Sequence, residues 1–188
     1  MDTDVTRPAP TARAASTPRT QPAGHLVVMG VAGSGKTTIA GLLSDRLGLT
    51  LAEADEFHPA ANIAKMSAGT PLTDADRAPW LAAIRDWLST QADSGHAAVV
   101  TCSALKRDYR DVLRAAHGTV RFVHLDGSAA LLADRIQERS GHFMPPALLP
   151  SQLADLEPLA DDEDGLVVDV AAAPDEIVAT VLAWLRQA

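Results

Sequence analysis

The sequence has few of the features that mark secreted, membrane-spanning or nucleic-acid-binding proteins. It contains one cysteine, Cys102, which excludes an internal disulfide framework and suits a reducing cytoplasm. No apolar run reaches the roughly 20 residues that span a bilayer. The formal net charge of −8 opposes a polyanionic partner such as nucleic acid. We therefore expect a soluble, cytoplasmic protein with no membrane or nucleic-acid partner, in which any anionic ligand is held by a local group of cations.

The first 23 residues differ in composition from the rest of the chain. They are rich in Pro, Thr, Ala and Arg and lack apolar periodicity, so they cannot repay the entropy lost on ordering. Their arginines faintly suggest a transit peptide, but Asp2, Asp4 and the prolines spoil an amphipathic helix. We predict a disordered tail over residues 1–23 and one domain over residues 24–188, because the chain is long and apolar enough for a single packed core.

Short apolar runs alternate with helical patterns from residue 25 onward. The expected strands are His25–Met29, Leu51–Ala54, Ala97–Cys102, Val120–Leu125 and Leu166–Val170. The expected helices are Lys36–Leu47, Arg77–Gln91 with Asp76 as N-cap and Pro79 in the first turn, Ala104–Ala116, Ala129–Arg139 and Pro174–Arg186. Continuous apolar strands are typical of a sheet buried on both faces. The alternation predicts an α/β fold with a five-stranded, mostly parallel, doubly wound sheet, and ligands at the carboxyl ends of its strands.

A glycine-rich stretch between the first expected strand and helix has the spacing G-x-x-x-x-G-K-[ST]. This strand–loop–helix context favours a phosphate-binding loop over a ligand-free turn. The backbone N–H groups would surround phosphate oxygens, Lys36 would reach the β- and γ-phosphates, and the Thr37 hydroxyl would bind Mg²⁺. The nucleotide-binding residues expected here are Gly30, Ala32, Gly33, Ser34, Gly35, Lys36, Thr37 and Thr38. The implied cofactors are ATP and Mg²⁺.

The destination of the phosphate depends on residues outside this loop. No guanine-reading N-K-x-D segment is present. Asp126 could imitate the metal-side acid of a motor ATPase, but the Gly-Ser pair after it indicates a turn and a helix N-cap. Asp55 follows the second expected strand, which we expect beside the phosphate-loop strand. There a carboxylate could accept the proton of an attacking hydroxyl and hold a Mg²⁺-bound water, although a helix-capping aspartate is an alternative.

Two groups of polar residues are expected near Asp55. His58, Asn62 and Lys65 have the spacing of one helical face, with a solvated surface face as the alternative. The expected helix after the third strand opens with cations, which oppose the helix dipole, as a site for an anion would. Its polar residues are Ser103, Lys106, Arg107 and Arg110. A solvated surface is again the alternative, and Cys102 beside them is interpreted as a small buried residue rather than a nucleophile.

Arg135 and Arg139 lie four residues apart and could reach over the phosphates. Arginines in that position would neutralise charge in the transition state and exclude water. Ion pairs with Asp134 and Glu138 are the alternative. The following segment, Ser140 to Pro150, suits a mobile lid because it contains Gly and three prolines.

With these residues laid out, the chain resembles the small bacterial-type gluconokinases, a branch of the P-loop small-molecule kinases that includes shikimate kinase and adenylate kinase. The resemblance covers nearly everything from Gly24 to the C-terminus. It rests on "GVAGSGKTT", "ADEFHPAANIAKMSAGTPLTDADRAPWL", "CSALKRDYRD", "RSGHFM" and "LLPSQLADLEP". Ala54 stands where the family often has Gly, a departure that does not touch Asp55.

The resemblance implies transfer of the ATP γ-phosphoryl group to the 6-hydroxyl of D-gluconate, with Lys36, Asp55 and Arg135 as catalytic residues and Asp55 as base. It places the adenine between Arg135 and the loop near Ala172–Pro174, a helical lid at approximately residues 135–157, and suggests a homodimer. The candidates for the acceptor pocket are Asp55, His58, Lys65, Arg77, Ser103, Lys106, Arg110 and His142. Two alternatives stay open: a kinase for another hydroxy acid, such as a shikimate-like acceptor, and an ATPase or switch without a small-molecule acceptor.

Overall fold

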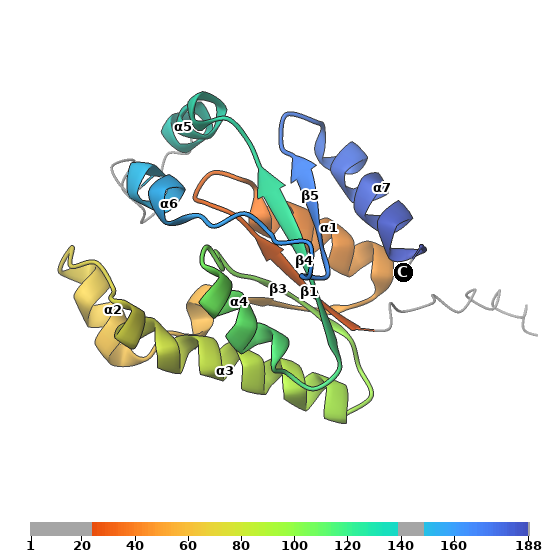
Figure 1. Cartoon of the computed structure of the whole chain (residues 1–188), viewed down its shortest axis with the longest axis horizontal. Helices are drawn as coiled ribbons and strands as arrows, with labels where there is room; N and C mark the ends of the chain where they lie inside the picture. The colour runs from red at the N-terminus through yellow and green to blue at the C-terminus, as the bar shows by residue number, and fades with distance from the viewer. Residues whose placement is uncertain (1–23, 139–148, 188) are drawn as a thin grey trace, which may run out of the picture.

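Five strands form one parallel sheet in the computed structural model, which describes residues 24–138 and 149–187 (Figure 1). The strands are β1 (Gly24–Met29), β2 (Thr50–Glu53), β3 (Ala98–Thr101), β4 (Thr119–Asp126) and β5 (Gly165–Asp169). Their order is β2-β3-β1-β4-β5, and all four neighbouring pairs are parallel. The predicted five-stranded parallel sheet is confirmed, and every strand end lies within one residue of its predicted position.

The neighbour of β1 differs from the prediction. We expected the strand before Asp55 to lie beside the phosphate-loop strand, but β3 lies between them, with Val100 opposite both Val27 of β1 and Ala52 of β2. The pattern of apolar residues could not reveal this order, because every strand of a buried parallel sheet is apolar on both faces. The turn after β3 therefore adjoins the phosphate loop, and the Gly30 N–H donates to the Ser103 carbonyl at 3.3 Å.

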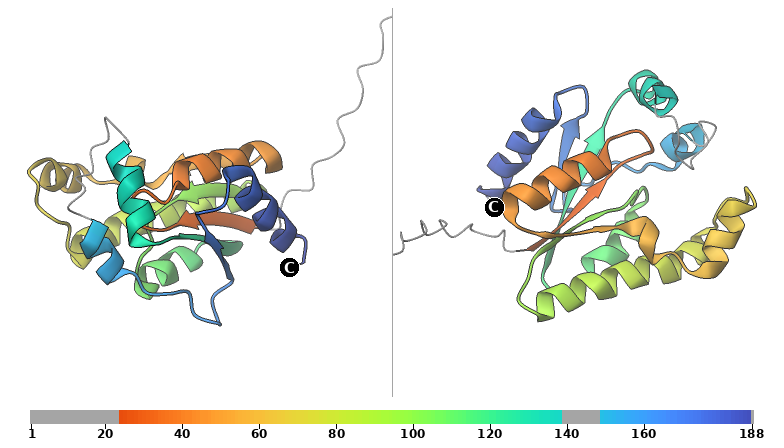
Figure 2. Two further views of the ribbon diagram at one scale, coloured as in Figure 1. Left: turned by 90° about the horizontal axis from the view of Figure 1, so that it is seen from above. Right: turned by 180° about the vertical axis from the view of Figure 1, so that it is seen from behind.

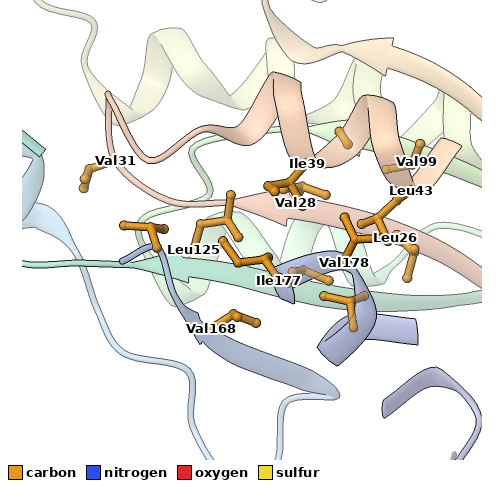
Figure 3. Packing of buried hydrophobic residues seen from close by; sticks show 14 of the residues in the cluster. Leu26, Val28, Val31, Ile39, Leu43, Val99, Leu125, Val168, Ile177 and Val178 are labelled. Carbon is orange, nitrogen blue, oxygen red and sulfur yellow. The ribbon is translucent and has the colours of Figure 1, made fainter. Parts of the chain in front are cut away.

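Helices cover both faces of the sheet (Figure 2). They are α1 (Lys36–Leu47), α2 (Ala60–Ser67), α3 (Asp74–Asp93), α4 (Arg107–Arg114), α5 (Ala129–Glu138), α6 (Leu149–Asp155) and α7 (Pro174–Leu185), with a short 3-10 turn η1 (Ala54–Phe57) after β2. The core cluster on one face of the sheet includes residues of α1 and α7 (Figure 3). The cluster on the other face includes residues of α3 and α4.

Strand β1 shows why the strands are continuously apolar. Leu26 and Val28 belong to the cluster with α1 and α7, whereas Val27 and Met29 belong to the cluster with α3 and α4. All four side chains are fully buried, because successive side chains of a strand point to opposite faces. Because helices cover both faces of the sheet, ligands can reach it only at the loops that follow the strands.

Helix α3 begins one turn earlier than predicted. Its N-cap is Thr73, whose hydroxyl accepts the Asp76 N–H while the Asp76 carboxylate accepts the Thr73 N–H. This reciprocal capping box makes Asp76 the third helical residue, so the prediction that it is the N-cap is wrong. Pro79 is then the sixth residue of α3 rather than part of its first turn, and it costs the helix one internal hydrogen bond.

Some predictions concern residues outside the described ranges. These are the tail over residues 1–23, Arg139, His142 and the middle of the expected lid, residues 139–148. Helix α6 lies in the last part of that lid, which was expected to be helical, but its bounds were not predicted because seven residues with a proline at the second position show little periodicity. Among the described helices, none has the length and apolar character needed to cross a bilayer.

Candidate active site

The phosphate loop joins β1 to α1 and closes on its own lysine. The Lys36 ammonium donates to the carbonyls of Gly30 and Val31, both at 3.0 Å. Gly33 has a φ of 79°, and a Cβ at this position would lie 2.8 Å from the Ile136 side chain, so only glycine fits. The predicted strand–loop–helix context is confirmed. Lys36 sits against the first half of the loop, where phosphate oxygens could replace its carbonyl partners.

A cavity of about 400 Å³ opens beside the second half of the loop. Its walls come from the loop and α1, from α5, and from the segment after β5. The lining residues are Gly33, Ser34, Gly35, Thr38, Ile39, Arg135, Val170, Ala172, Pro174 and Ile177. Arg135 donates to the Val170 carbonyl at 2.7 Å. The hollow therefore lies where the adenine was expected, and its volume suits a small-molecule ligand.

Carboxylates gather at the end of β2. Asp55 lies inside η1 and is exposed, and the N-cap of η1 is Glu53, which makes no side-chain capping bond. The helix-capping alternative for Asp55 is therefore not realised. The sequence reasoning missed Glu53, which accepts a hydrogen bond from Thr101 through one carboxylate oxygen. Its other oxygen is buried and has no hydrogen-bond partner among the described residues. The signal available in the sequence was a second acid two positions before Asp55.

The expected face of His58, Asn62 and Lys65 holds the local structure together. His58 precedes α2 rather than lying on it, and its ring stacks on Trp80 with centroids 4.5 Å apart. Burial lowers the pKa of His58 and keeps the imidazole neutral near pH 7. Asn62 is buried and donates to the Asp76 carbonyl at 2.8 Å. Lys65 donates to the Asp76 carboxylate at 2.6 Å, and this hydrogen bond is the largest cause that lowers the pKa of Asp76 to about 2.

Two of the expected acceptor cations converge on one carboxylate. The Lys106 ammonium lies 3.1 Å from the Asp74 carboxylate, and the Arg77 guanidinium lies 3.6 Å from it. Tyr109 donates its hydroxyl to the same carboxylate, and this bond is the main cause of a lowered Asp74 pKa. Both cations also lie over the Tyr109 ring, at 5.6 Å and 5.8 Å from its centroid. Sequence reasoning missed Asp74 and Tyr109, which bring the start of α3 and α4 together.

Arg110 does not face the crevice. It is 0% exposed, and its guanidinium forms a two-point ion pair with the buried Glu163 carboxylate at 2.6 Å and 2.9 Å. Its remaining donors reach the carbonyls of Ala104, Leu105, Glu157 and Pro158. All donors are therefore engaged within the core, and the structure does not support the acceptor role expected for this residue.

The chain itself supplies the anions that the cationic start of α4 needs. Arg107 pairs with Asp162 at 2.6 Å, and the backbone N–H of Arg107 donates to the Glu157 carboxylate at 2.6 Å. Arg107 and Arg110 therefore have internal partners at the helix start where an anionic ligand was expected. Only the sequence-distant acids of residues 157–163 could have revealed this. Lys106 stays at the rim with Asp74.

The interpretation of Cys102 as a buried apolar residue is confirmed. The side chain is 2% exposed, and burial raises the pKa of its thiol to about 12. The thiol stays protonated at neutral pH and cannot serve as a nucleophile.

Comparisons with known proteins agree with this geometry. A family model described as an AAA domain matches residues 26–159. A gluconokinase from Gluconobacter oxydans is 58% identical over 153 residues, which cover 81% of this chain and 86% of that protein. A gluconokinase structure from Sinorhizobium meliloti superposes with a TM-score of 0.79 at 47% identity, over 89% of this chain and 94% of the other. A sugar kinase structure from Janibacter sp. has a TM-score of 0.84 at 53% identity, over 88% and 95% of the two chains.

Proposed function

The chain belongs to the gluconokinase family, and from this premise we propose that it transfers the γ-phosphoryl group of ATP to the 6-hydroxyl of D-gluconate, giving 6-phospho-D-gluconate and ADP. The observation that carries the proposal is a cavity on the phosphate loop, together with a group of acids and cations at the ends of β2 and β3. A polyhydroxylated acid suits such a site, because its hydroxyl can donate to a carboxylate of the protein and its own carboxylate can pair with a cation.

The nucleotide side supplies binding and charge neutralisation. The N–H groups of the phosphate loop and the amino end of α1 would hold the phosphates. Lys36 would exchange its two loop carbonyls for β- and γ-phosphate oxygens, and Arg135 would border the adenine in the cavity. Because phosphoryl transfer depends mainly on positioning and electrostatics, these groups would carry much of the rate.

The Thr37 hydroxyl of the loop and the carboxylates at the end of β2 are oxygen groups of the kind that would hold a Mg²⁺ ion. Mg²⁺ prefers oxygen ligands and keeps several waters, so it needs only one or two protein groups. The Thr37 hydroxyl and the Asp55 carboxylate are both exposed, and Glu53 has a buried carboxylate oxygen with no hydrogen-bond partner among the described residues. A bound Mg²⁺ would neutralise charge on the β- and γ-phosphates.

On the acceptor side, Asp55 would orient the 6-hydroxyl and take its proton. The carboxylate of gluconate would bind beside Arg77 and Lys106, because Asp74 balances only one of their two positive charges. His58, held neutral on Trp80, and Ser103 would contribute hydrogen bonds to the sugar hydroxyls. Lys65 would keep its structural partner Asp76 rather than contact the acceptor.

A panel of acceptors tests the proposal. ADP release would be followed in a coupled assay with gluconate, shikimate, other sugar acids and nucleoside monophosphates. We expect the highest kcat/KM with gluconate. A higher value for another acceptor would replace gluconate as the substrate, and ATP turnover indifferent to every acceptor would support an ATPase or switch.

We also expect a homodimer in the cytoplasm, with residues 135–157 acting as a lid and residues 1–23 as a tail outside the catalytic domain. The acidic net charge of the chain supports small-molecule partners over nucleic acid. Light scattering at several concentrations would test the dimer, and deletion of residues 2–22 would test the tail, with unchanged activity as the expected result.

A further inference from the structure

Helix α6 is hydrogen-bonded to the phosphate loop. The Ala32 N–H donates to the side-chain oxygen of Gln152 at 2.7 Å, across 120 positions of sequence. Both residues are half-buried. The hydrogen bond joins a backbone group of the nucleotide loop to a helix that is not part of the sheet–loop–helix unit.

The contact lies at the terminal-phosphate end of the loop. Gly33, Ser34 and Gly35 line the nucleoside cavity. The first half of the loop faces the other way, because the Gly30 N–H donates to Ser103 and Lys36 lies against the first two carbonyls. Since Lys36 is the side chain that grips the β- and γ-phosphates in such loops, Gln152 meets the loop beside the phosphoryl group that would be transferred.

The segment that carries Gln152 is anchored to the acceptor side at its other end. We call residues 149–163 the strap. Within it, the Glu157 N–H donates to the Leu105 carbonyl at 2.8 Å, and the Glu157 carboxylate accepts the Arg107 N–H. The fully buried pair of Arg110 and Glu163 fixes the end of the strap on α4. These anchors flank Lys106, one of the two cations proposed for the gluconate carboxylate.

The strap therefore connects the phosphate loop to the start of α4, next to the cation proposed for the acceptor. Phosphoryl transfer breaks the bond between the γ-phosphorus and the bridging oxygen of ADP, and the new bond forms to the 6-hydroxyl or, in the wasteful reaction, to water. An element fixed on both sides of the reacting groups can hold them in line and exclude water. Gln152 is its fixed point on the nucleotide side.

We propose that Gln152 is a positioning residue, whose hydrogen bond to Ala32 ties the strap to the phosphate loop and directs the phosphoryl group to the acceptor rather than to water. The proposal rests on the proposed kinase activity. It adds a role that none of the loop, Asp55 or the acceptor cations performs, namely control of the partition between transfer and hydrolysis.

Gln152→Met tests the tie, because methionine keeps the length and helix propensity of glutamine but cannot accept the Ala32 N–H. We expect kcat to fall about tenfold with KM for ATP nearly unchanged, because only positioning is lost. The amount of 6-phosphogluconate formed per ADP released should fall, while acceptor-free ATP hydrolysis rises. Gln91→Met, at the far end of α3, makes the same change away from the crevice and should behave as wild type.

Gln152→Glu provides the conservative rescue, because a carboxylate oxygen can still accept the Ala32 N–H. At saturating ATP it should recover the product-to-ADP ratio that Gln152→Met loses, although its charge should raise KM for ATP. A Gln152→Met enzyme with wild-type kcat and product ratio would overturn the proposal, even if its melting temperature fell. Failure of Gln152→Glu to recover the ratio would also count against it.

Hydrogen exchange separates this proposal from the proposed function. In the nucleotide-free protein, the Ala32 amide should exchange faster in Gln152→Met than in wild type or Gln91→Met. If gluconate had no effect on ATP turnover by the wild-type enzyme, the proposed function would fail. The exchange rate of the Ala32 amide and the rate of acceptor-free ATP hydrolysis would still test the hydrogen bond between Gln152 and Ala32. An unchanged Ala32 exchange rate in Gln152→Met would overturn it.

Discussion

The proposed nucleotide side and the proposed acceptor side of the site are built from different parts of the chain. The phosphate-binding part of the proposed nucleotide side is the backbone of one continuous loop, with glycines that admit its conformation and Lys36 bonded within it. The acceptor side consists of side chains from η1, α3 and α4, held by acids distant in sequence. A local motif can therefore specify the first side, whereas the second exists only after packing. On the acceptor side, the residues proposed to touch the ligand must therefore be distinguished from the residues that hold them in place.

The largest effects should come from one residue on each side. Lys36→Ala and Asp55→Asn should each lower kcat by about 10²-fold or more, because electrostatic stabilisation and base positioning supply factors of this size. Calorimetric measurement of ATP affinity distinguishes the two variants. Lys36→Ala should weaken ATP binding, and Asp55→Asn should leave it nearly intact. A near-normal kcat for Asp55→Asn would show that another residue acts as the base.

The next largest effect should be on stability rather than activity. Arg110→Met leaves Glu163 as a buried, unpaired carboxylate, and breaking a buried ion pair costs about 3–5 kcal/mol. For a chain of this length, that corresponds to a fall in Tm of roughly 10 °C. Arg107→Met, on the same helix with an exposed partner, is the matched control and should change Tm little. A raised KM for gluconate with an unchanged Tm would instead restore Arg110 to the acceptor site.

A smaller effect should appear in acceptor affinity alone. Arg77→Ala should raise KM for gluconate about ten- to hundredfold, because a hydrogen bond to a charged group contributes about 1.5–3 kcal/mol. KM for ATP should stay within about threefold, since Arg77 lies with Asp74 and Tyr109 rather than at the nucleotide cavity. Arg85→Ala, farther along α3 with an exposed partner, provides the control. Equal rises in both KM values would show that the two sides are not separable at this residue.

The smallest effect should be a change in acid stability on the acceptor side. The folded pKa of Asp76 is lowered from 3.8 to about 2, chiefly by the Lys65 hydrogen bond. A lowered folded pKa contributes stability above the unfolded pKa, and this contribution is lost as pH falls through the folded value. Denaturation followed by circular dichroism should therefore show wild type losing more stability than Asp76→Asn between about pH 4 and pH 2. Parallel curves for the two proteins would contradict the assignment.

Prediction from sequence succeeded where the determinants are local. The strands, the phosphate loop and helix α1 follow from runs of apolar residues and from glycine spacing, and α1 has the predicted bounds. The start of α3 was missed although its signal was local, because Thr73 and Asp76 cap the helix jointly and Asp76 alone resembles an N-cap. The position of β2 was wrong because apolar strands carry no mark of their neighbours.

The candidate site likewise has features set by local sequence and features set by packing. By itself, the sequence determined the glycine loop with Lys36 between β1 and α1, and it placed Asp55 and the cations of α4 near the sheet edge, because these features depend on spacing along the chain. Only the tertiary structure decided which cations stay near the surface and which are buried. Arg110 forms a buried ion pair with Glu163, whereas Lys106 pairs with the exposed Asp74. The physical reason is that a charge takes its role from the partner that folding brings within a few ångströms, and that partner lies tens of residues away along the chain.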